Sequence, residues 1–267
     1  MPHPIERLRW IARAEGAGPS LLAREAAGAL GGVRDDPAAM VLACRRLIER
    51  HPGIGPIWWL AARVLAAGDP PAEAWAVAGD LESDPTPAVL AAELPEEVTA
   101  TVVGWQEHLG EALRRRGDLG VLVVRGDGEG PGLVRRLASS GVEACDVPDS
   151  GLGAAVRESD LVLLEALALG PGGFTATAGS LAAAATGYVL GIPVWVVAGV
   201  GRVLPGRLWE ALQSRLDAEG EAWETTVDVV PLALASSVVG PSGREAPDDA
   251  VKRADCPITP ELLRWES

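Results

Sequence analysis

The residues best placed to do chemistry follow predicted strands in the second half of the chain. Arg125 comes directly after the apolar run 120–124. A guanidinium beside exposed backbone N–H groups at a strand end suits a phosphate or a carboxylate. The alternative is an ordinary surface ion pair, for which the nearby acidic residues are Asp127, Glu129 and Asp149. The sequence leaves both interpretations of Arg125 open.

Glycines fill the turn that Arg125 opens. Gly126 and Gly128 belong to a run spaced G-x-G-x-G-x-G, whereas a dinucleotide fingerprint needs G-x-G-x-x-G and an acidic residue ending the next strand. Cys145 occupies that strand end and Asp146 follows it, so the sequence supports an NAD site only weakly. A tight connection from strand to helix needs some of the same glycines. We therefore predict no cofactor.

Further candidates lie at later strand and helix ends. Asp149 follows the second predicted strand, and Glu165 ends the third as the only charged residue in 161–201. Glu165 is either an acid or hydrogen-bonding group of a site, or a partly exposed carboxylate that caps a neighbouring helix. Gly179 and Ser180 either present N–H groups and a hydroxyl to an anion at a helix N-terminus, or simply cap that helix.

The histidines and cysteines form no catalytic or metal-binding pattern. The three histidines lie within the first 108 residues, away from the predicted strand ends. The three cysteines, Cys44, Cys145 and Cys256, are far apart and form no C-x-x-C pair. We therefore predict no metal site and no disulfide framework, and we expect a reduced, cytoplasmic environment.

Composition excludes several classes of partner. Of the 267 residues, 48% are hydrophobic and 22% are charged, which is typical of a globular protein. The formal net charge of −14 repels phosphate backbones and anionic membranes, so we expect neither nucleic acid nor a membrane as partner. The segment 181–201 is apolar enough to suggest a membrane span, but Gly191 and Pro193 divide it. We predict a buried helix followed by a buried strand instead.

The elements that position these residues differ between the two halves of the chain. Residues 1–116 are predicted as a helical N-terminal domain. Ser20 is expected to cap the first helix, Asp36 opens the second, Pro56 precedes the third, and further helices cover 71–82 and 96–116. Residues 117–267 are predicted as a Rossmann-like domain, because apolar runs at 120–124, 142–145, 160–164 and 194–198 alternate with helical stretches. A loop through 170–173 is expected before the last of these helices. The expected fold class is α/β, an all-helical domain followed by a mostly parallel, doubly wound sheet. Ligands of such sheets bind beyond the carboxyl ends of the strands.

The order of these motifs resembles one family, the α, β and δ subunits of translation initiation factor 2B together with methylthioribose-1-phosphate and ribose-1,5-bisphosphate isomerases. The run from VVRGDGEGPG to LVLLEALALGPGG (123–173) is similar to the family's arginine-containing turn and the strands after it. FTATAGSLAAAATGYVLGIPVWVVAG (174–199) resembles the family's phosphate region and the helix and strand that follow. GAGPSLLAREAAGAL (16–30) is similar to an early helix of the family.

The resemblance implies binding residues but not the catalytic ones. Arg125 falls on the family's ligand-binding arginine, Asp149 on an acidic residue after the second strand, and Gly179-Ser180 on a Gly-Thr pair. The catalytic aspartate falls on Leu167, the phosphate-contacting Asn-Lys pair falls on Ala176-Thr177, and the catalytic cysteine has no counterpart near 101–105. Leucine cannot shuttle the protons that sugar isomerisation requires.

Two functional hypotheses follow from this pattern. The first is a non-catalytic, regulatory relative, homodimeric as the resemblance implies, that binds a small phosphorylated or acidic metabolite or a protein partner. The alternative is an aldose–ketose isomerase of the ribose-1,5-bisphosphate or methylthioribose-1-phosphate type. It would use Glu165 as a relocated acid or base and Arg125 for phosphate, which requires both side chains to face one pocket.

Overall fold

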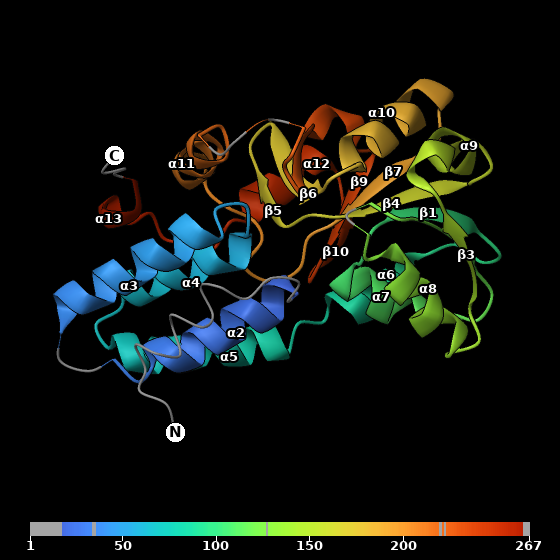
Figure 1. The fold of residues 1–267 in the computed structure, drawn as a ribbon. Helices are drawn as coiled ribbons and strands as arrows, with labels where there is room; N and C mark the ends of the chain where they lie inside the picture. Colours follow the sequence, from blue (N-terminus) through green and yellow to red (C-terminus); the bar gives the residue numbers. More distant parts are fainter. Residues whose placement is uncertain (1–17, 34–35, 127, 219–220, 222, 264–267) are drawn as a thin grey trace.

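The computed structural model describes residues 18–33, 36–126, 128–218, 221 and 223–263. Its first part is a bundle of helices, α2 (Pro19–Leu30), α3 (Pro37–Arg50), α4 (Gly55–Ala66) and α5 (Pro70–Glu82) (Figure 1). A proline in the first turn starts each of them, where its missing N–H costs nothing. Trp58 and Trp59 are fully buried in the core that these helices share with α11 (Gly206–Leu216) and α13 (Pro260–Leu263).

The second part is a seven-stranded sheet in the order β10-β9-β7-β4-β1-β2-β3. Its strands are β1 (Thr99–Val103), β2 (Gly120–Val124), β3 (Glu143–Val147), β4 (Leu161–Glu165), β7 (Val194–Val197), β9 (Ser237–Gly240) and β10 (Gly243–Glu245). All neighbouring pairs are parallel except β9 with β10. The predicted α/β class with a mostly parallel sheet is therefore confirmed.

Helices cover both faces of this sheet (Figure 1). One face carries α6 (Thr86–Glu93), α7 (Glu107–Leu113) and α8 (Gly130–Ala138), whose leucines share a core with Leu163 of β4. The other face carries α9 (Leu152–Arg157), α10 (Ser180–Leu190) and α12 (Pro247–Ala250), whose core includes Val103 of β1. Successive strand residues alternate between these faces, and this alternation decides where the site residues point.

The predicted helix over 96–116 is wrong in its first part. Residues 99–103 form β1, which lies between β4 and β2 in the middle of the sheet. The sequence TATVV is β-branched but does not alternate, because the strand is buried on both faces. Even Thr101 is buried, and its hydroxyl hydrogen-bonds to Ser159 at 2.7 Å. The all-helical part of the chain thus ends before β1, and the division at residues 116 and 117 stays a prediction.

A second, three-stranded sheet lies where a loop was expected. β5 (Ala168–Gly170) and β6 (Gly173–Thr177) form a hairpin, and β8 (Val227–Pro231) pairs antiparallel with β6. After this hairpin α10 ends at Gly191 (φ 73°), and β7 follows. The apolar segment 181–201 is therefore a helix and a buried strand, as predicted, but the helix is not buried, because Tyr188, Val189 and Leu190 are exposed. Within the described residues, no helix has the length and apolar character needed to cross a membrane.

One predicted helix cap is also corrected. Asp36 caps α3 as expected, accepting a hydrogen bond from the Ala39 N–H at 2.9 Å. Ser20, expected to cap the first helix, lies inside α2, and Gly18 occupies the N-cap position. The Ser20 hydroxyl is buried and has no hydrogen-bond partner among the described residues. The proline at position 19 starts the helix two residues earlier than a cap at Ser20 would.

Candidate functional site

Two of the predicted glycines meet at the carboxyl edge of the main sheet. Gly126 follows β2 with φ 60°, and Gly179 precedes α10 with φ 96°. A Cβ atom on Gly126 would lie 3.2 Å from the Val103 Cγ1 atom, and one on Gly179 would lie 3.3 Å from the same atom. Both backbones therefore pass close to the end of β1, on the face that α9 and α10 cover. Positive φ and this close approach both favour glycine.

The hydrogen-bond donors of the first turn already have partners. The Arg125 guanidinium donates to Asp146 through Nε at 3.0 Å and Nη2 at 2.8 Å. The N–H of Gly126 donates to Asp149 Oδ1 at 2.8 Å. The hydrogen bonds from Arg125 hold the pKa of Asp146 below its usual value. Arg125 therefore forms a surface ion pair, as one interpretation predicted, but its partner is Asp146. Asp127, one of the expected partners, lies outside the described residues.

The N-terminus of α10 is likewise occupied by a carboxylate. Asp228 of β8 accepts hydrogen bonds from the N–H groups of Gly179 at 2.9 Å and Leu181 at 2.8 Å. Ser180 does not cap the helix, and its buried hydroxyl has no hydrogen-bond partner. Asp228 lies 49 residues from Gly179 in the chain, so its role was not visible in the local sequence.

Glu165 points to the opposite face of the sheet. It lies on the same side of β4 as Leu163, toward α7, and its side chain is 2% exposed. Its carboxylate accepts hydrogen bonds from the backbone N–H groups of His108 at 2.8 Å and Leu109 at 3.1 Å, at the start of α7. The predicted alternative of a helix-capping carboxylate therefore holds for Glu165, but the side chain is buried and not partly exposed as expected.

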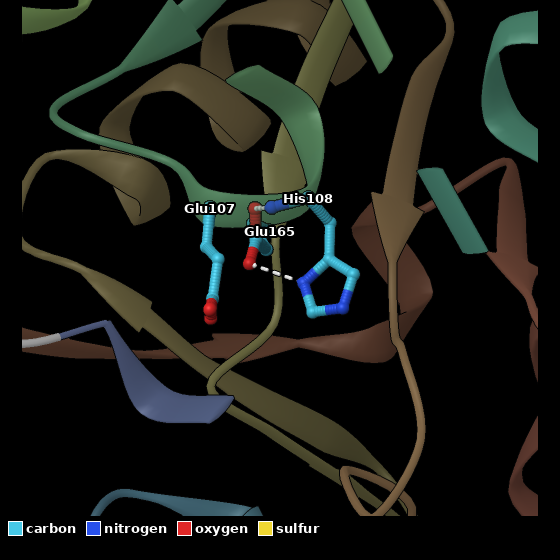
Figure 2. Close-up of side chains that lie close together, drawn as sticks. All are labelled: Glu107, His108 and Glu165. Atoms are coloured by element: carbon cyan, nitrogen blue, oxygen red, sulfur yellow. Dashed lines mark hydrogen bonds and ion pairs between the residues drawn. The ribbon is translucent and has the colours of Figure 1, made fainter. Parts of the chain in front are cut away.

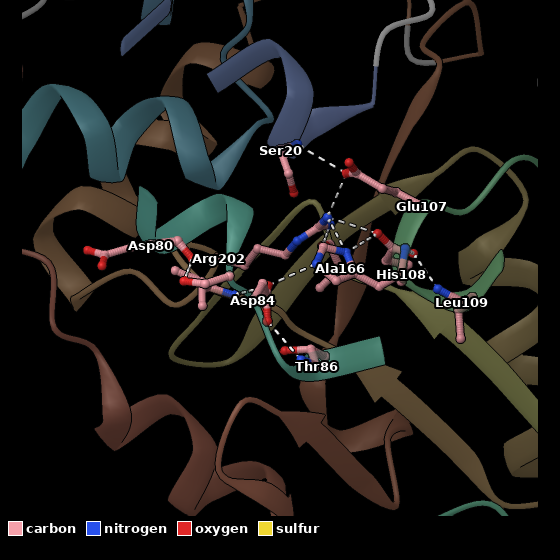
Figure 3. Close-up of polar contacts among 12 residues, drawn as sticks. Ser20, Asp80, Asp84, Thr86, Glu107, His108, Leu109, Ala166 and Arg202 are labelled. Atoms are coloured by element: carbon pink, nitrogen blue, oxygen red, sulfur yellow. Dashed lines mark hydrogen bonds and ion pairs between the residues drawn. The ribbon is translucent and has the colours of Figure 1, made fainter. Parts of the chain in front are cut away.

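Two basic side chains complete the surroundings of Glu165. The His108 Nδ1 atom lies 2.9 Å from Glu165 Oε1 (Figure 2), and the Arg202 Nη2 atom lies 2.8 Å from the same oxygen. On its other side, His108 places Nε2 2.9 Å from Asp84 Oδ2. Asp84 also accepts the backbone N–H of Val200 at 2.7 Å. The buried group thus joins side chains from the connection between α5 and α6, from α7, from β4 and from the loop after β7 (Figure 3).

Glu107 connects this group to the helical bundle. Its carboxylate accepts the backbone N–H of Ser20 at 3.1 Å and lies 3.5 Å from Arg202 Nη2. A Cβ atom on Gly18 would lie 3.1 Å from the Glu107 carboxyl carbon. The N-terminus of α2 therefore rests against Glu107, as Figure 3 shows.

The electrostatics of the group favour its charged form. Burial alone would raise the pKa of Glu165, but Arg202, His108 and backbone N–H groups outweigh it and hold that pKa at about 2. Asp84 behaves in the same way, and His108 holds its pKa at about 2 against burial. Burial and Arg202 act to lower the pKa of His108, but Glu165 and Asp84 raise it to about 9. Arg202 Nη2 also lies 2.8 Å from His108 Nδ1, so this ring nitrogen faces both the Glu165 carboxylate and the guanidinium.

Glu107, His108 and Glu165 have ligand atoms within 4.8 Å of one another, a spacing that could suit a metal ion. In this chain, however, Arg202 already lies among them, 2.8 Å from Glu165 and 3.5 Å from Glu107. Its guanidinium supplies the positive charge that a metal ion would bring, and the two could not share the space. These residues therefore do not fit a metal ion.

Sequence reasoning identified Glu165 but missed its partners. One signal was available: Arg202 is the first charged residue after Glu165, at the end of a long charge-free run. A lone buried acid needs a cation, and Arg202 was the next one in the chain. Asp84 and His108 carried no such local signal, since they lie in the half predicted as a separate helical domain.

No protein-family model matches the sequence, and neither does any curated protein. Solved structures do match it, and they define the fold as that of initiation factor 2B subunits, so the resemblance seen in the sequence is confirmed at the level of fold. Translation initiation factor eIF-2B of Pyrococcus horikoshii OT3 gives a TM-score of 0.78 at 17% identity, covering 94% of this chain and 100% of that one. The tetrameric eIF2B-beta2-delta2 complex of C. thermophilum gives 0.70 at 16% identity, with 93% and 92% covered. The eIF2B beta subunit of Chaetomium thermophilum gives 0.67 at 14% identity, with 91% and 86% covered.

Proposed function

We propose that this chain is a non-catalytic, regulatory protein with the initiation factor 2B fold, and that it acts by binding a protein partner. One observation carries the proposal. The donors at the sheet edge that could hold a small anionic ligand are already bonded to carboxylates of the chain itself: Arg125 to Asp146, Gly126 to Asp149, and the start of α10 to Asp228. A phosphorylated or acidic metabolite would have to displace these carboxylates, which makes it the less favoured ligand.

The surroundings of Glu165 also argue against the isomerase alternative. A general acid or base works best when its pKa lies near the operating pH, whereas the pKa of Glu165 is about 2 and that of His108 is about 9. Each polar atom of the Glu165 carboxylate is also engaged by a donor. Arg125 is half exposed and pairs with Asp146, so no contact links it to Glu165 in the described part of the chain.

Self-association is part of the proposal, as a homodimer in a cytoplasmic setting. α10 exposes consecutive apolar side chains near its end, Tyr188 at 65%, Val189 at 80% and Leu190 at 45%. Apolar side chains gathered on one surface typically mark contacts with another molecule. The C. thermophilum neighbour is a tetrameric complex of two kinds of subunit, which supports assembly as the mode of action here.

Turnover is the most direct test of the proposal. The protein should convert neither ribose-1,5-bisphosphate nor methylthioribose-1-phosphate, with product followed by NMR. Turnover that disappears in Glu165→Gln would overturn the non-catalytic assignment. The same sugar phosphates and inorganic phosphate should leave the melting temperature unchanged, whereas a ligand at a hundred times its Kd would stabilise the fold by about 3 kcal/mol.

Self-association is tested by light scattering on the eluting protein. The wild type should elute with twice the mass of one chain, and Val189→Glu should elute as a monomer because a charge on an apolar interface is unfavourable. Leu42→Glu is the matched control, since Leu42 on α3 is 49% exposed and lies in the helical bundle. A monomeric wild type, or equal loss of the dimer in both variants, would refute α10 as the interface.

A further inference from the structure

A cavity of about 940 Å³ opens at one end of the helical bundle. It lies where the carboxyl ends of α2 and α4 meet the amino ends of α3 and α5, and Glu261 of α13 also lines it. This cavity involves none of the sheet-edge residues described above. Its volume is in the range of sites that hold a small ligand or a few residues of a peptide.

The aromatic wall of the cavity is Trp75. The side chain is 58% exposed, which is high for a residue that folded proteins usually bury. On one side the indole rests against Gly31, where a Cβ atom would lie 2.7 Å from the Trp75 Nε1 atom. The ring is therefore held in place while more than half of its surface stays free. An open indole face attracts cations, and guanidinium groups most often.

Three carboxylates line the same cavity. Asp36 and Asp69 each use Oδ1 to cap a helix, accepting the N–H of Ala39 at 2.9 Å and of Ala72 at 3.1 Å. The caps fix both side chains and leave Oδ2 without a hydrogen bond from any described residue. Glu261 has no ion pair among the described residues either, and no described lining residue is Lys, Arg or His. A cationic group would therefore meet preorganised carboxylates, two of which also offset the partial positive charge of a helix amino end.

The backbone adds to this negative potential. α2 and α4 both point their carboxyl ends, which carry partial negative charge, at the cavity. α4 ends at Ala67, which is extended (φ −79°, ψ 146°) and forms no described capping bond, so the last carbonyls of the helix are open. The two helix amino ends that also reach the cavity are already neutralised by Asp36 and Asp69.

We propose that this cavity docks an arginine-containing, basic peptide segment of a protein partner. An arginine would stack on Trp75 and place its remaining N–H groups toward Asp69 and Asp36, as planar guanidinium groups do. The inference builds on the proposed function only in that the chain works by binding another protein. The surface is separate from the α10 face, so the two proposals succeed or fail independently.

The probe is a fluorescein-labelled hexa-arginine peptide, followed by anisotropy at about 0.15 M salt so that distant charges are screened. Trp75→Ala should weaken binding about tenfold or more, and Trp75→Phe should retain most of it. The triple variant Asp36→Asn, Asp69→Asn, Glu261→Gln should also weaken binding at least about tenfold. Asparagine still caps helices, so this variant keeps the fold.

Matched controls separate a docking site from general attraction to an acidic protein. Trp223→Ala removes a tryptophan that is 81% exposed outside the cavity. Glu96→Gln, Glu143→Gln and Glu210→Gln together change the net charge by the same amount as the triple variant, at exposed positions elsewhere. Both controls should bind the peptide within about twofold of the wild type.

Three outcomes would overturn the proposal. The first is an equal loss of binding in the controls and the cavity variants, and the second is no binding by the wild type. The third is displacement of the peptide by spermine at an equal concentration, which would assign the cavity to a free amine. Dimer mass and sugar-phosphate turnover, measured on Trp75→Ala, should match the wild type, so that failure here is distinguishable from failure of the proposed function.

Discussion

Removing Arg202 is the sharpest test of the buried acid–base group. Its side chain is fully buried, and Nη2 lies 2.8 Å from Glu165 Oε1 while Nη1 donates to the carbonyl of Ala166. Arg202→Met keeps a long apolar side chain but removes every one of these contacts. The Glu165 carboxylate would then be buried with only His108 and two backbone N–H groups to compensate it.

The expected cost follows from the chemistry of an unpaired buried charge. Breaking a buried ion pair by removing one partner typically destabilises a protein by about 3–5 kcal/mol. His108 still faces Glu165 at 2.9 Å, which places the expected value at the lower end, about 3 kcal/mol. For a chain of this length such a loss lowers the melting temperature by on the order of 10 °C.

Urea unfolding of four proteins measures the interaction itself. They are the wild type, Arg202→Met, Glu165→Gln and the double variant, followed by circular dichroism. The double variant should cost about 2 kcal/mol less than the sum of the single variants, because removing both charges leaves no unpaired one. Arg244→Met is the control, since Arg244 is a cation that is 42% exposed, and it should cost less than about 1 kcal/mol.

Two results would refute this reasoning. If Arg202→Met costs no more than Arg244→Met, the buried guanidinium does not stabilise the carboxylate. If the two single effects add, Arg202 and Glu165 act independently despite their 2.8 Å separation.

Three further predictions concern other parts of the chain. The pKa of His108 is raised from 6.5 to about 9 in the fold. Its contribution to stability, about 3 kcal/mol, should therefore be fully present below pH 6.5 and lost as the pH rises through 9. Urea unfolding from pH 6 to 10 should show this loss in the wild type and not in His108→Asn. Gly201→Ala should destabilise the fold by about 2–4 kcal/mol in the same assay. The backbone φ of Gly201 is 74°, and a new Cβ atom would lie 2.7 Å from the buried indole of Trp59. A cost under about 0.5 kcal/mol would contradict this backbone conformation. Exposed Cys145 should react with Ellman's reagent in the native protein, whereas the Cys145→Ser variant should not react. The two remaining thiols, Cys44 and Cys256, are buried, and burial raises their pKa values to about 12. Rapid reaction of a second thiol would argue against that burial.

The strands that sequence predicted well are those with a local signature. The run 120–124 is β2, with the same ends, because it is apolar, β-branched and followed by a glycine turn. β1 was missed because a central strand of a parallel sheet is buried on both faces, so period-two alternation disappears. The β5–β6 hairpin was missed because Gly170, Pro171, Gly172 and Gly173 are equally typical of a loop, and only its pairing with distant β8 distinguishes the two.

The same distinction between local and distant determinants applies to the candidate site. Positions that depend on the local chain could be predicted, such as a glycine turn after β2 and an acid at the end of β4. Partners could not, since His108 lies 57 residues from Glu165 and Asp228 lies 49 residues from Gly179. An ion pair or helix cap at such separations is fixed by the packing of whole elements, which no local pattern encodes.

Asp228, which occupies the N–H groups at the start of α10, leads to a prediction that bears directly on the proposed function. If Asp228 fills a position suited to an anion, Asp228→Ala should expose the N–H groups of Gly179 and Leu181 beside the unpartnered hydroxyl of Ser180. The variant should be less stable by about 1 kcal/mol, as expected for a lost helix cap. Sulfate should restore that loss by binding the helix N-terminus.

The comparison that decides this point is between sulfate and chloride at equal ionic strength. Sulfate strengthens folding generally, so the wild type and Glu210→Ala, which removes an exposed carboxylate elsewhere, serve as references for that background. Asp228→Ala should gain about 1 kcal/mol more from sulfate than either reference does. An equal gain in all three proteins would mean that the start of α10 is not an anion-binding position. Asp228 would then no longer support the proposal that carboxylates of the chain itself occupy the ligand site.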